Sequence, residues 1–189
     1  MSATEQRQTG ASTLAATPAT SGAGEDESSS APSKLLFDLG GIDLTRIVVT
    51  KKELETWNPH RGDMALLDGV VWRSEDASRG VGVHHARKTE FWAAGHFPGR
   101  PIMPGVLMVE TAAQLACYLF NARIGKPTLA VFLRIEECVF RSMVEPDRDL
   151  FILCQEVKRN RRRFISDVQG IVEGKPAFSA RISGMTMEA

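Results

Sequence analysis

Residues 95 to 114 bring together a histidine, a proline-rich loop, a helix start and a carboxylate within twenty positions. His96 is a side chain that can accept a proton near neutral pH. Glu110 follows fourteen residues later and can deliver a proton. Gly105 stands where the free N–H groups of a helix start would stabilise a developing oxyanion. A base, an acid and an oxyanion site suit an enzyme that removes a proton beside a carbonyl and expels a β-hydroxyl group.

The residues between His96 and Glu110 predict how these groups are held. Three prolines, each of which fixes its own φ and disfavours a helical residue before it, prevent a helix from starting before Pro104. They are Pro98, Pro101 and Pro104. Residues 106–122 lack Gly and Pro and are rich in Leu, Met and Ala, which predicts a helix of about four to five turns.

The predicted helix at 106–122 is apolar on nearly every face, so we expect it to be buried on all sides. Glu110 and Gln114 are the main polar exceptions. Residues four apart are neighbours on one helix face, so Gln114 is expected to hydrogen-bond to the Glu110 carboxylate and to orient it. A carboxyl group in such a helix is costly unless it is paired or used.

The motif around His96 and Glu110 resembles that of a known enzyme family. His96-Phe97-Pro98, followed by Pro101, Pro104-Gly105-Val106-Leu107, Glu110 and Ala113-Gln114, resembles the signature of the 3-hydroxyacyl-(acyl carrier protein) dehydratases of the FabZ type, in the hotdog-fold superfamily. The sister dehydratase/isomerase family has Asp where this chain has Glu110, which favours the plain dehydratase. The resemblance implies a lyase that converts a (3R)-3-hydroxyacyl thioester on acyl carrier protein to the trans-2-enoyl thioester, in fatty-acid or related lipid synthesis.

The resemblance also implies roles for individual residues. His96 and Glu110 are expected to be catalytic, Gly105 and Val106 to bind the substrate oxyanion, and Gln114, Phe97 and Pro98 to support them. No metal or other cofactor is expected. The family implies a homodimer in which His96 of one chain works with Glu110 of the other, and in much of the family such dimers assemble into hexamers.

Three alternatives share the expected fold. They are an acyl thioesterase, the sister isomerase and a non-catalytic acyl-binding module. The last is kept open by two departures from the family pattern. Gly62-Asp63-Met64 replaces an aromatic-proline-aromatic patch, and Asp147-Arg148 replaces Gly-Asp. The sequence leaves open the acyl chain length and whether the substrate is carried on acyl carrier protein or on CoA.

Composition limits the broad class. With 189 residues, 43% of them hydrophobic and 24% charged, the chain suits one globular domain, expected at 34–189. Residues 1–33 are mostly Ser, Thr, Ala, Gly and Pro, so we expect a disordered tail. Residues 34–189 carry 22 basic and 19 acidic residues, too small a surplus to indicate nucleic-acid binding.

The location of the protein can also be inferred from the sequence. Three widely spaced cysteines indicate neither a disulfide framework nor a metal site, which favours a reducing, cytoplasmic compartment. The first thirty residues do not resemble a signal peptide, and the chain has no long uninterrupted apolar run, so membrane insertion is not expected.

The remaining segments predict one further helix and a series of strands. Thr50 and Glu53 have capping-box spacing, so a short helix is expected there. Strands are expected at 64–72, 79–86, 128–139, 150–157, 164–172 and 178–183, the one at 128–139 as a central strand. In the strand at 178–183 apolar and polar residues alternate, so one face is expected to be buried. Such strands around one helix indicate an α+β protein, and the resemblance implies the hotdog fold, a curled antiparallel sheet around a central helix.

Four arginines and three histidines are also considered as functional residues. Arg159, Arg161, Arg162 and Arg163 lie in a basic run, which we interpret either as a solvated hairpin tip or as a docking patch for the acidic surface of a carrier protein. His84 and His85 are adjacent in a strand and therefore point to opposite faces. Neither they nor His60 is expected to be catalytic.

Overall fold

The computed structural model describes residues 34–187, and the tail expected at 1–33 lies outside the described residues. The elements follow one another along the chain with short connections, except for one long loop at 87–104. They are β1 (Val49–Thr50), α1 (Lys51–Trp57), the 3-10 helix η1 (Gly62–Met64), β2 (Gly69–Arg73), β3 (Arg79–Ala86), α2 (Gly105–Ile124), β4 (Ala130–Phe140), β5 (Arg148–Arg159), β6 (Arg163–Val172) and β7 (Lys175–Thr186).

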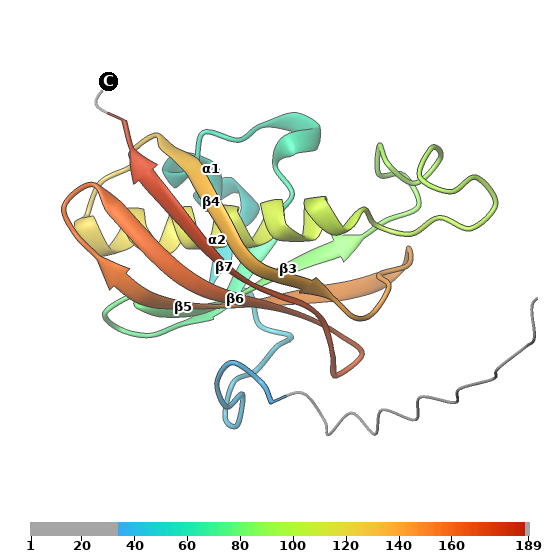
Figure 1. The fold of residues 1–189 in the computed structure, drawn as a ribbon, viewed down its shortest axis with the longest axis horizontal. Coiled ribbons are helices and arrows are strands. Elements are labelled where there is room, and N and C mark those ends of the chain that lie inside the picture. Colours follow the sequence, from blue (N-terminus) through green and yellow to red (C-terminus); the bar gives the residue numbers. More distant parts are fainter. Residues whose placement is uncertain (1–33, 188–189) are drawn as a thin grey trace, which may run out of the picture. The chain divides into compact units, whose positions relative to one another are not determined.

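The strands form one seven-stranded antiparallel sheet in the order β1-β2-β3-β5-β6-β7-β4. Figure 1 shows the sheet curling around α2, which runs along its concave face. The expected α+β architecture, a curled sheet around one long helix, is therefore confirmed. The helix itself spans Gly105–Ile124, close to the predicted 106–122, and ends at Gly125, whose positive φ of 75° closes the last turn.

Contact between α2 and the sheet depends on small residues in β3. A Cβ added to Gly80 would lie 2.9 Å from the Leu119 side chain, and one added to Gly82 would lie 2.7 Å from Leu67. The missing side chains let the helix approach the strand closely. The main core forms here, between α2 and the inner faces of β3, β5, β6 and β7.

The opposite face of the sheet is covered by residues 34–48. Their apolar side chains pack on a second cluster that includes Val71, Val81 and Leu153. The Gln169 side chain fixes this segment, because its Oε1 accepts from the Leu36 N–H at 2.9 Å and its Nε2 donates to the Lys34 carbonyl at 3.2 Å. Both faces of the central strands are therefore buried.

Several local predictions are confirmed. Thr50 caps α1 in the predicted capping box with Glu53. β3 matches the predicted strand at 79–86, with His84 buried and His85 half exposed. β7 alternates buried and more exposed residues as predicted. The turn before it, Glu173-Gly174, has positive φ at both positions, as a two-residue hairpin loop requires.

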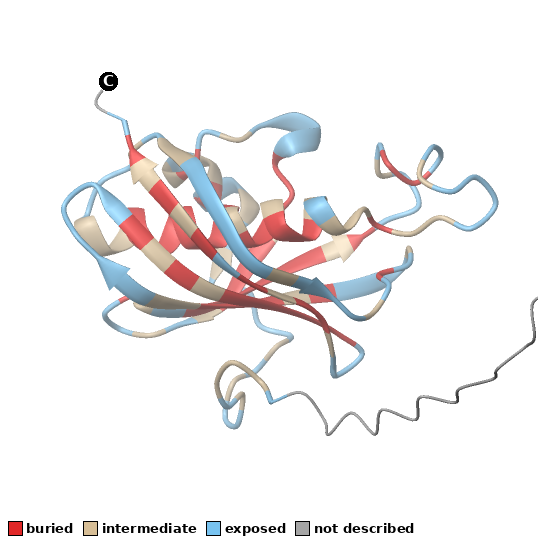
Figure 2. Ribbon diagram, viewed as in Figure 1, coloured by how far each residue is buried: buried red, intermediate tan, exposed pale blue. Residues whose placement is uncertain are grey.

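Two strand predictions are wrong in part. The strand expected at 64–72 begins only at Gly69, because the backbone of residues 64–67 hydrogen-bonds to the side chain of Gln114 instead of to a neighbouring strand. The strand expected at 128–139 is present as β4 but lies at the edge of the sheet and not at its centre. Figure 2 shows much of β4 as exposed, although its sequence is apolar.

No helix within residues 34–187 combines the length and apolar character needed to cross a membrane.

Candidate active site

The loop before α2 holds His96 in a defined orientation. Its main-chain N–H donates to the Trp92 carbonyl at 2.8 Å. The imidazole Nδ1 lies 2.6 Å from the Ile102 carbonyl oxygen. Because a carbonyl only accepts hydrogen bonds, this contact places the proton of the neutral imidazole on Nδ1. The lone pair of Nε2 is then available to act as a base.

Phe97 and Pro98, the predicted supporting residues, are both exposed. The Phe97 ring lies 4.2 Å from the His96 ring, measured between centroids, and packs against it. The positive φ of Phe97, 60°, is rare for a residue with a bulky side chain. Such backbone strain is often found at functional positions, and here it adjoins the histidine.

The first turn of α2 presents free backbone donors. Its N-cap residue, Pro104, makes no side-chain capping bond, so the N–H groups at the helix start lack that partner. A Cβ at Gly105 would lie 2.7 Å from the ring of Phe140, which shows how closely β4 approaches here. Val106 is 70% exposed. The geometry allows Gly105 and Val106 to offer N–H groups to an oxyanion.

The prediction that α2 is buried on all sides is wrong along one stripe. Val106 is exposed, and Glu110 and Ala113 are half buried, whereas most residues of the helix are buried. These positions follow the spacing of a single helix face. Two residues of the stripe, Glu110 and Ala113, line a cavity.

Gln114 holds Glu110 and the chain beside it. It is 2% exposed, and its Nε2 donates to Glu110 Oε1 at 3.0 Å and to the Met64 carbonyl at 2.7 Å. Its Oε1 accepts from the N–H groups of Leu66 and Leu67 at 3.0 and 3.1 Å. One buried amide therefore orients the carboxylate and ties α2 to the segment before β2.

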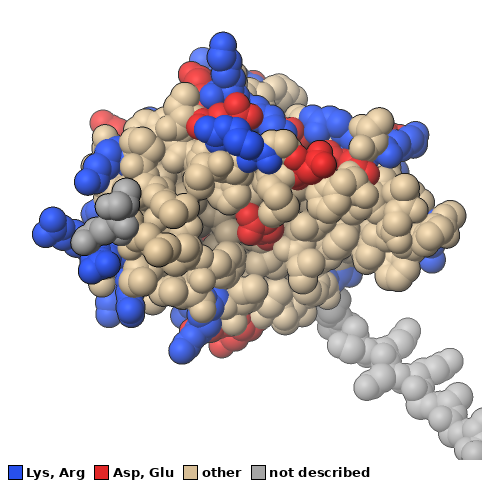
Figure 3. All heavy atoms as spheres, turned by 90° about the horizontal axis from the view of Figure 1, so that it is seen from above, with Lys and Arg blue, Asp and Glu red and all other residues tan. Residues whose placement is uncertain are grey.

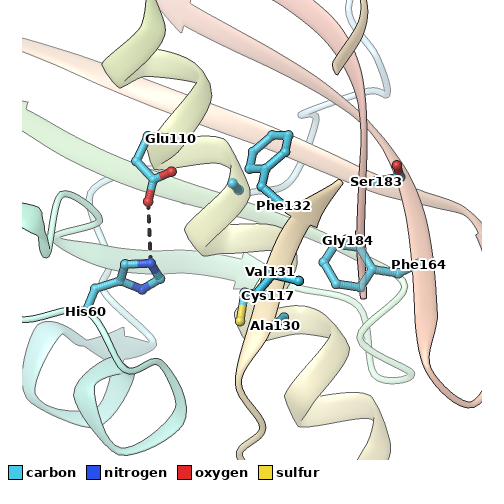
Figure 4. A pocket seen from close by; sticks show the side chains of 10 residues that line it. His60, Glu110, Cys117, Ala130, Val131, Phe132, Phe164, Ser183 and Gly184 are labelled. Atoms are coloured by element: carbon cyan, nitrogen blue, oxygen red, sulfur yellow. Dashed lines mark ion pairs between the residues drawn. The ribbon is translucent and has the colours of Figure 1, made fainter. Parts of the chain in front are cut away.

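His60 is the second neighbour of Glu110 and was missed by reasoning from the sequence. Its Nε2 lies 3.4 Å from Glu110 Oε1, and both side chains are about one quarter exposed. Figure 4 shows the two side chains pointing toward one another, and both line a cavity. His84 and His85 do not line this cavity.

The cavity lies between α2 and the strands β4, β6 and β7 and has a volume of about 80 Å³. Apart from His60 and Glu110 its walls are mostly small or apolar. They are formed by Ala113, Cys117, Ala130, Val131, Phe132, Phe164, Ser183 and Gly184. Figure 3 shows a broad uncharged surface with one acidic group in a hollow and charged side chains of both signs around its edge. His96 does not line the cavity of its own chain.

Cys117 is not a nucleophile in this cavity. Burial raises the pKa of its thiol to about 12, and the nearby Glu110 charge adds to the shift. The thiol therefore stays protonated at neutral pH. No cluster of His, Cys, Asp and Glu within residues 34–187 could hold a metal ion.

The predicted docking arginines lie on the β5–β6 hairpin. Arg161 is exposed, and Arg162 donates its main-chain N–H to the Asn160 side chain, which shapes the turn. Arg159 and Arg163 line a groove of about 460 Å³, together with other basic residues of the neighbouring strands. This groove shares three wall residues with the cavity: Phe164, Ser183 and Gly184.

Comparison with known proteins identifies the family. The family model of the FabA-like domain matches residues 58–181. The chain is 33% identical over 144 residues to the 3-hydroxyacyl-(acyl-carrier-protein) dehydratase FabZ of Rickettsia africae, covering 74% of this chain and 97% of that protein. It is 38% identical over 104 residues to the FabZ dehydratase of Halalkalibacterium halodurans, covering 54% of this chain and 74% of the relative.

Solved structures agree on the fold. The dehydratase heterocomplex ApeI:P from Xenorhabdus doucetiae matches with a TM-score of 0.63 and 12% identity, over 71% of this chain and 91% of that one. An HP0420 homologue from Helicobacter felis matches with a TM-score of 0.54 and 10% identity, over 71% and 88%. At such identities the likeness concerns the hotdog fold alone. On the family model and the sequence relatives, the chain belongs to the FabA-like family, among the 3-hydroxyacyl-(acyl-carrier-protein) dehydratases of the FabZ type.

Proposed function

We propose that the chain removes water from a (3R)-3-hydroxyacyl thioester on acyl carrier protein, in fatty-acid or related lipid synthesis. The observation that carries this proposal is the pair of oriented groups. His96 has a free Nε2 because the Ile102 carbonyl holds its Nδ1 proton, and Glu110 faces an apolar cavity with one oxygen held by Gln114. The sequence relatives are named as 3-hydroxyacyl-(acyl-carrier-protein) dehydratases, which supports the proposal.

The reaction uses one base and one acid. His96 Nε2 takes the proton from C2, and the electron pair of that C–H bond becomes the C2–C3 double bond. The C3–O bond breaks, its electron pair stays on oxygen, and Glu110 protonates that oxygen so that water leaves. The N–H groups of Gly105 and Val106 stabilise the thioester oxygen while enolate character develops there. The side chains of His96 and Glu110 can carry out both proton transfers, and the proposal includes no metal or other cofactor.

We place the complete site between two subunits. His96 does not line the cavity that holds Glu110 of its own chain. The β4 edge exposes large apolar side chains, and an unpaired strand edge is a template for another strand. These side chains are Phe132, Leu133, Ile135, Val139 and Phe140. A second copy pairing along β4 covers them and supplies His96 to Glu110, so the dimer is the active unit. Further assembly into hexamers remains compatible with this arrangement.

The carrier protein docks, in this proposal, at the basic groove beside the cavity. The groove is lined by Arg159 and Arg163 and adjoins the cavity through shared wall residues. Basic side chains at this entrance attract an acidic carrier and raise its association rate more than its final affinity. The three cysteines are free thiols, which agrees with the reducing cytoplasm as the proposed location.

The test is dehydration of a (3R)-3-hydroxybutyryl thioester by the 189-residue chain. His96→Ala and Glu110→Gln should each lower kcat by about 100- to 10,000-fold, the usual contribution of general acid–base catalysis. His85→Ala, on the sheet away from the cavity, serves as the matched control and should keep full activity. The product must be the trans-2-enoyl thioester. Release of free thiol or formation of the cis-3 isomer would instead support one of the alternative functions.

If the wild-type protein binds the thioester without turnover, or if either variant keeps wild-type activity, the proposed function is wrong.

A further inference from the structure

His60 approaches the carboxylate of the proposed acid from outside its helix. It lies between α1 and η1, and its Nε2 is 3.4 Å from Glu110 Oε1. Both side chains line the cavity and point toward one another (Figure 4). The described part of the chain gives Glu110 no other basic neighbour at ion-pair distance.

The backbone around His60 is held by a dedicated polar network. Asn58 Nδ2 donates to the Gln114 carbonyl at 2.9 Å, which ties this segment to α2. The Arg61 guanidinium donates to three carbonyls, those of Asn58 at 2.8 Å, His60 at 2.6 Å and Glu55 at 2.6 Å. Charge-assisted hydrogen bonds are strong and directional. The backbone that carries the imidazole is therefore held in place by hydrogen bonds.

The two oxygens of Glu110 have different surroundings. Oε1 accepts a hydrogen bond from Gln114 Nε2 at 3.0 Å and also faces His60 Nε2. Since Gln114 Nε2 can only donate, Oε1 acts as an acceptor. The acidic proton then belongs on Oε2, the oxygen that remains to meet a substrate hydroxyl.

The tautomer of His60 follows from its other nitrogen. Nδ1 is buried and has no hydrogen-bond partner within residues 34–187. A proton on Nδ1 would leave a buried donor without an acceptor, which is costly. The proton of the neutral ring therefore belongs on Nε2, the nitrogen that lies 3.4 Å from Glu110 Oε1.

We propose that His60 is a positioning residue for the acid step, and this inference rests on the proposed function. Together with Gln114 it holds Oε1 so that the proton of Glu110 sits on Oε2. When Oε2 gives that proton to the departing hydroxyl, the carboxylate charge spreads onto Oε1. The Gln114 Nε2–H already donates to Oε1 at 3.0 Å, and the His60 Nε2–H, now at 3.4 Å, moves closer to stabilise the new charge. Hydrogen bonds to a carboxylate are shorter and stronger than those to a neutral acid, so the contact tightens as the reaction proceeds.

The test compares three substitutions of His60 in the 189-residue chain, with the 3-hydroxybutyryl thioester as substrate. His60→Phe removes both nitrogens and keeps a ring, and it should lower kcat by about 10- to 100-fold, the effect of losing one hydrogen bond to a charged group. KM should change by less than about threefold, because the lost contact acts in the transition state. His60→Gln places an amide N–H near the position of Nε2 and should restore most of kcat.

If His60→Phe does not fold, a comparison of His60→Gln with His60→Asn still tests the inference. His60→Asn carries the same amide as His60→Gln but is one methylene too short to reach Glu110. The inference predicts high kcat for the Gln variant and low kcat for the Asn variant at equal thermal stability. His85→Phe, at a residue that pairs with Asp149 and does not line the cavity, should leave kcat unchanged.

A substrate with a better leaving group separates this role from a purely structural one. Fluoride needs less protonation than hydroxide to leave, so a 3-fluorobutyryl thioester depends less on the acid. His60→Phe should slow the hydroxy substrate far more than the fluoro substrate, whereas His96→Ala should slow both. Equal losses on the two substrates, or equal kcat for the Gln and Asn variants, overturn the inference about His60. An inactive wild-type protein would instead refute the proposed function.

Discussion

Gln114 gives the sharpest prediction about stability, because one buried side chain satisfies four groups. Its Oε1 accepts from the N–H groups of Leu66 and Leu67, and its Nε2 donates to Met64 O and Glu110 Oε1. Gln114→Leu keeps a similar volume but removes all four bonds. The N–H groups of Leu66 and Leu67 belong to buried residues and are left without their acceptor.

The size of the effect follows from those two N–H groups. An unsatisfied buried donor costs about 1–3 kcal/mol, and the added apolar side chain offsets part of the sum, so we expect a net loss of about 3 kcal/mol. For a domain of this size each kcal/mol lowers the melting temperature by about 2–4 °C. The midpoint of Gln114→Leu should therefore fall by about 6–12 °C.

Thermal and urea unfolding at one fixed protein concentration measure this loss, because the stability of an oligomer depends on concentration. Gln155→Leu is the matched control, since Gln155 is half exposed on β5. Its midpoint should move by less than about 3 °C. A free energy of unfolding for Gln114→Leu within about 1 kcal/mol of wild type would refute the assigned role of this amide.

Three further predictions concern other parts of the fold. Gly105→Ala places a Cβ 2.7 Å from the Phe140 ring, so it should lower the free energy of unfolding, measured in urea, by about 1–3 kcal/mol. Gly95→Ala is the control and should leave that free energy unchanged, because a Cβ there meets no atom within 4 Å. Burial tends to raise the pKa of Asp68, but hydrogen bonds from the His85 N–H and Arg87, with the Lys51 charge, hold it below 3.8. The ionised Asp68 therefore stabilises the fold above pH 3.8, and this stabilisation is lost as the pH falls through the folded-state pKa. Asp68→Asn should be less stable than the wild type at neutral pH, and the difference between the two should shrink below pH 3.8. Ile135→Glu places a charge on the exposed β4 edge, so this variant should sediment as a monomer and should be inactive. Val157→Glu, at an equally exposed residue of β5, should keep both the dimer and the activity.

The sequence predicted the elements well where local signals were strong. The prolines and the long apolar run located α2 within a few residues, and the capping box located α1. Alternation of apolar and polar residues located β7. These features are local, so each could be read without knowledge of the rest of the chain.

The errors arose where distant parts of the chain meet. The run at 128–139 is apolar enough for a central strand, yet β4 is an edge strand in the single chain. Apolar patterning reports burial in the assembled state, and the proposed dimer accounts for the mismatch. The late start of β2 depends on Gln114, which lies about fifty residues further along the chain.

His60 could not be assigned from the sequence for the same reason. It lies fifty residues before Glu110, and only the packing of the segment after α1 against α2 brings the two together. The available signal was its place in the polar turn Asn58-Pro59-His60-Arg61. In contrast, the pairing of Gln114 with Glu110 followed from helix geometry alone.

The central claim is that His96 and Glu110 meet across a subunit boundary, and complementation tests it most directly. His96→Ala and Glu110→Gln chains, each inactive alone, are given different affinity tags, co-expressed and purified as the mixed dimer. A shared site predicts that the mixed dimer recovers about half of the wild-type kcat, because one of its two sites contains both intact residues. If the mixed dimer is as inactive as its parents, the two residues do not work across the interface and the account is contradicted.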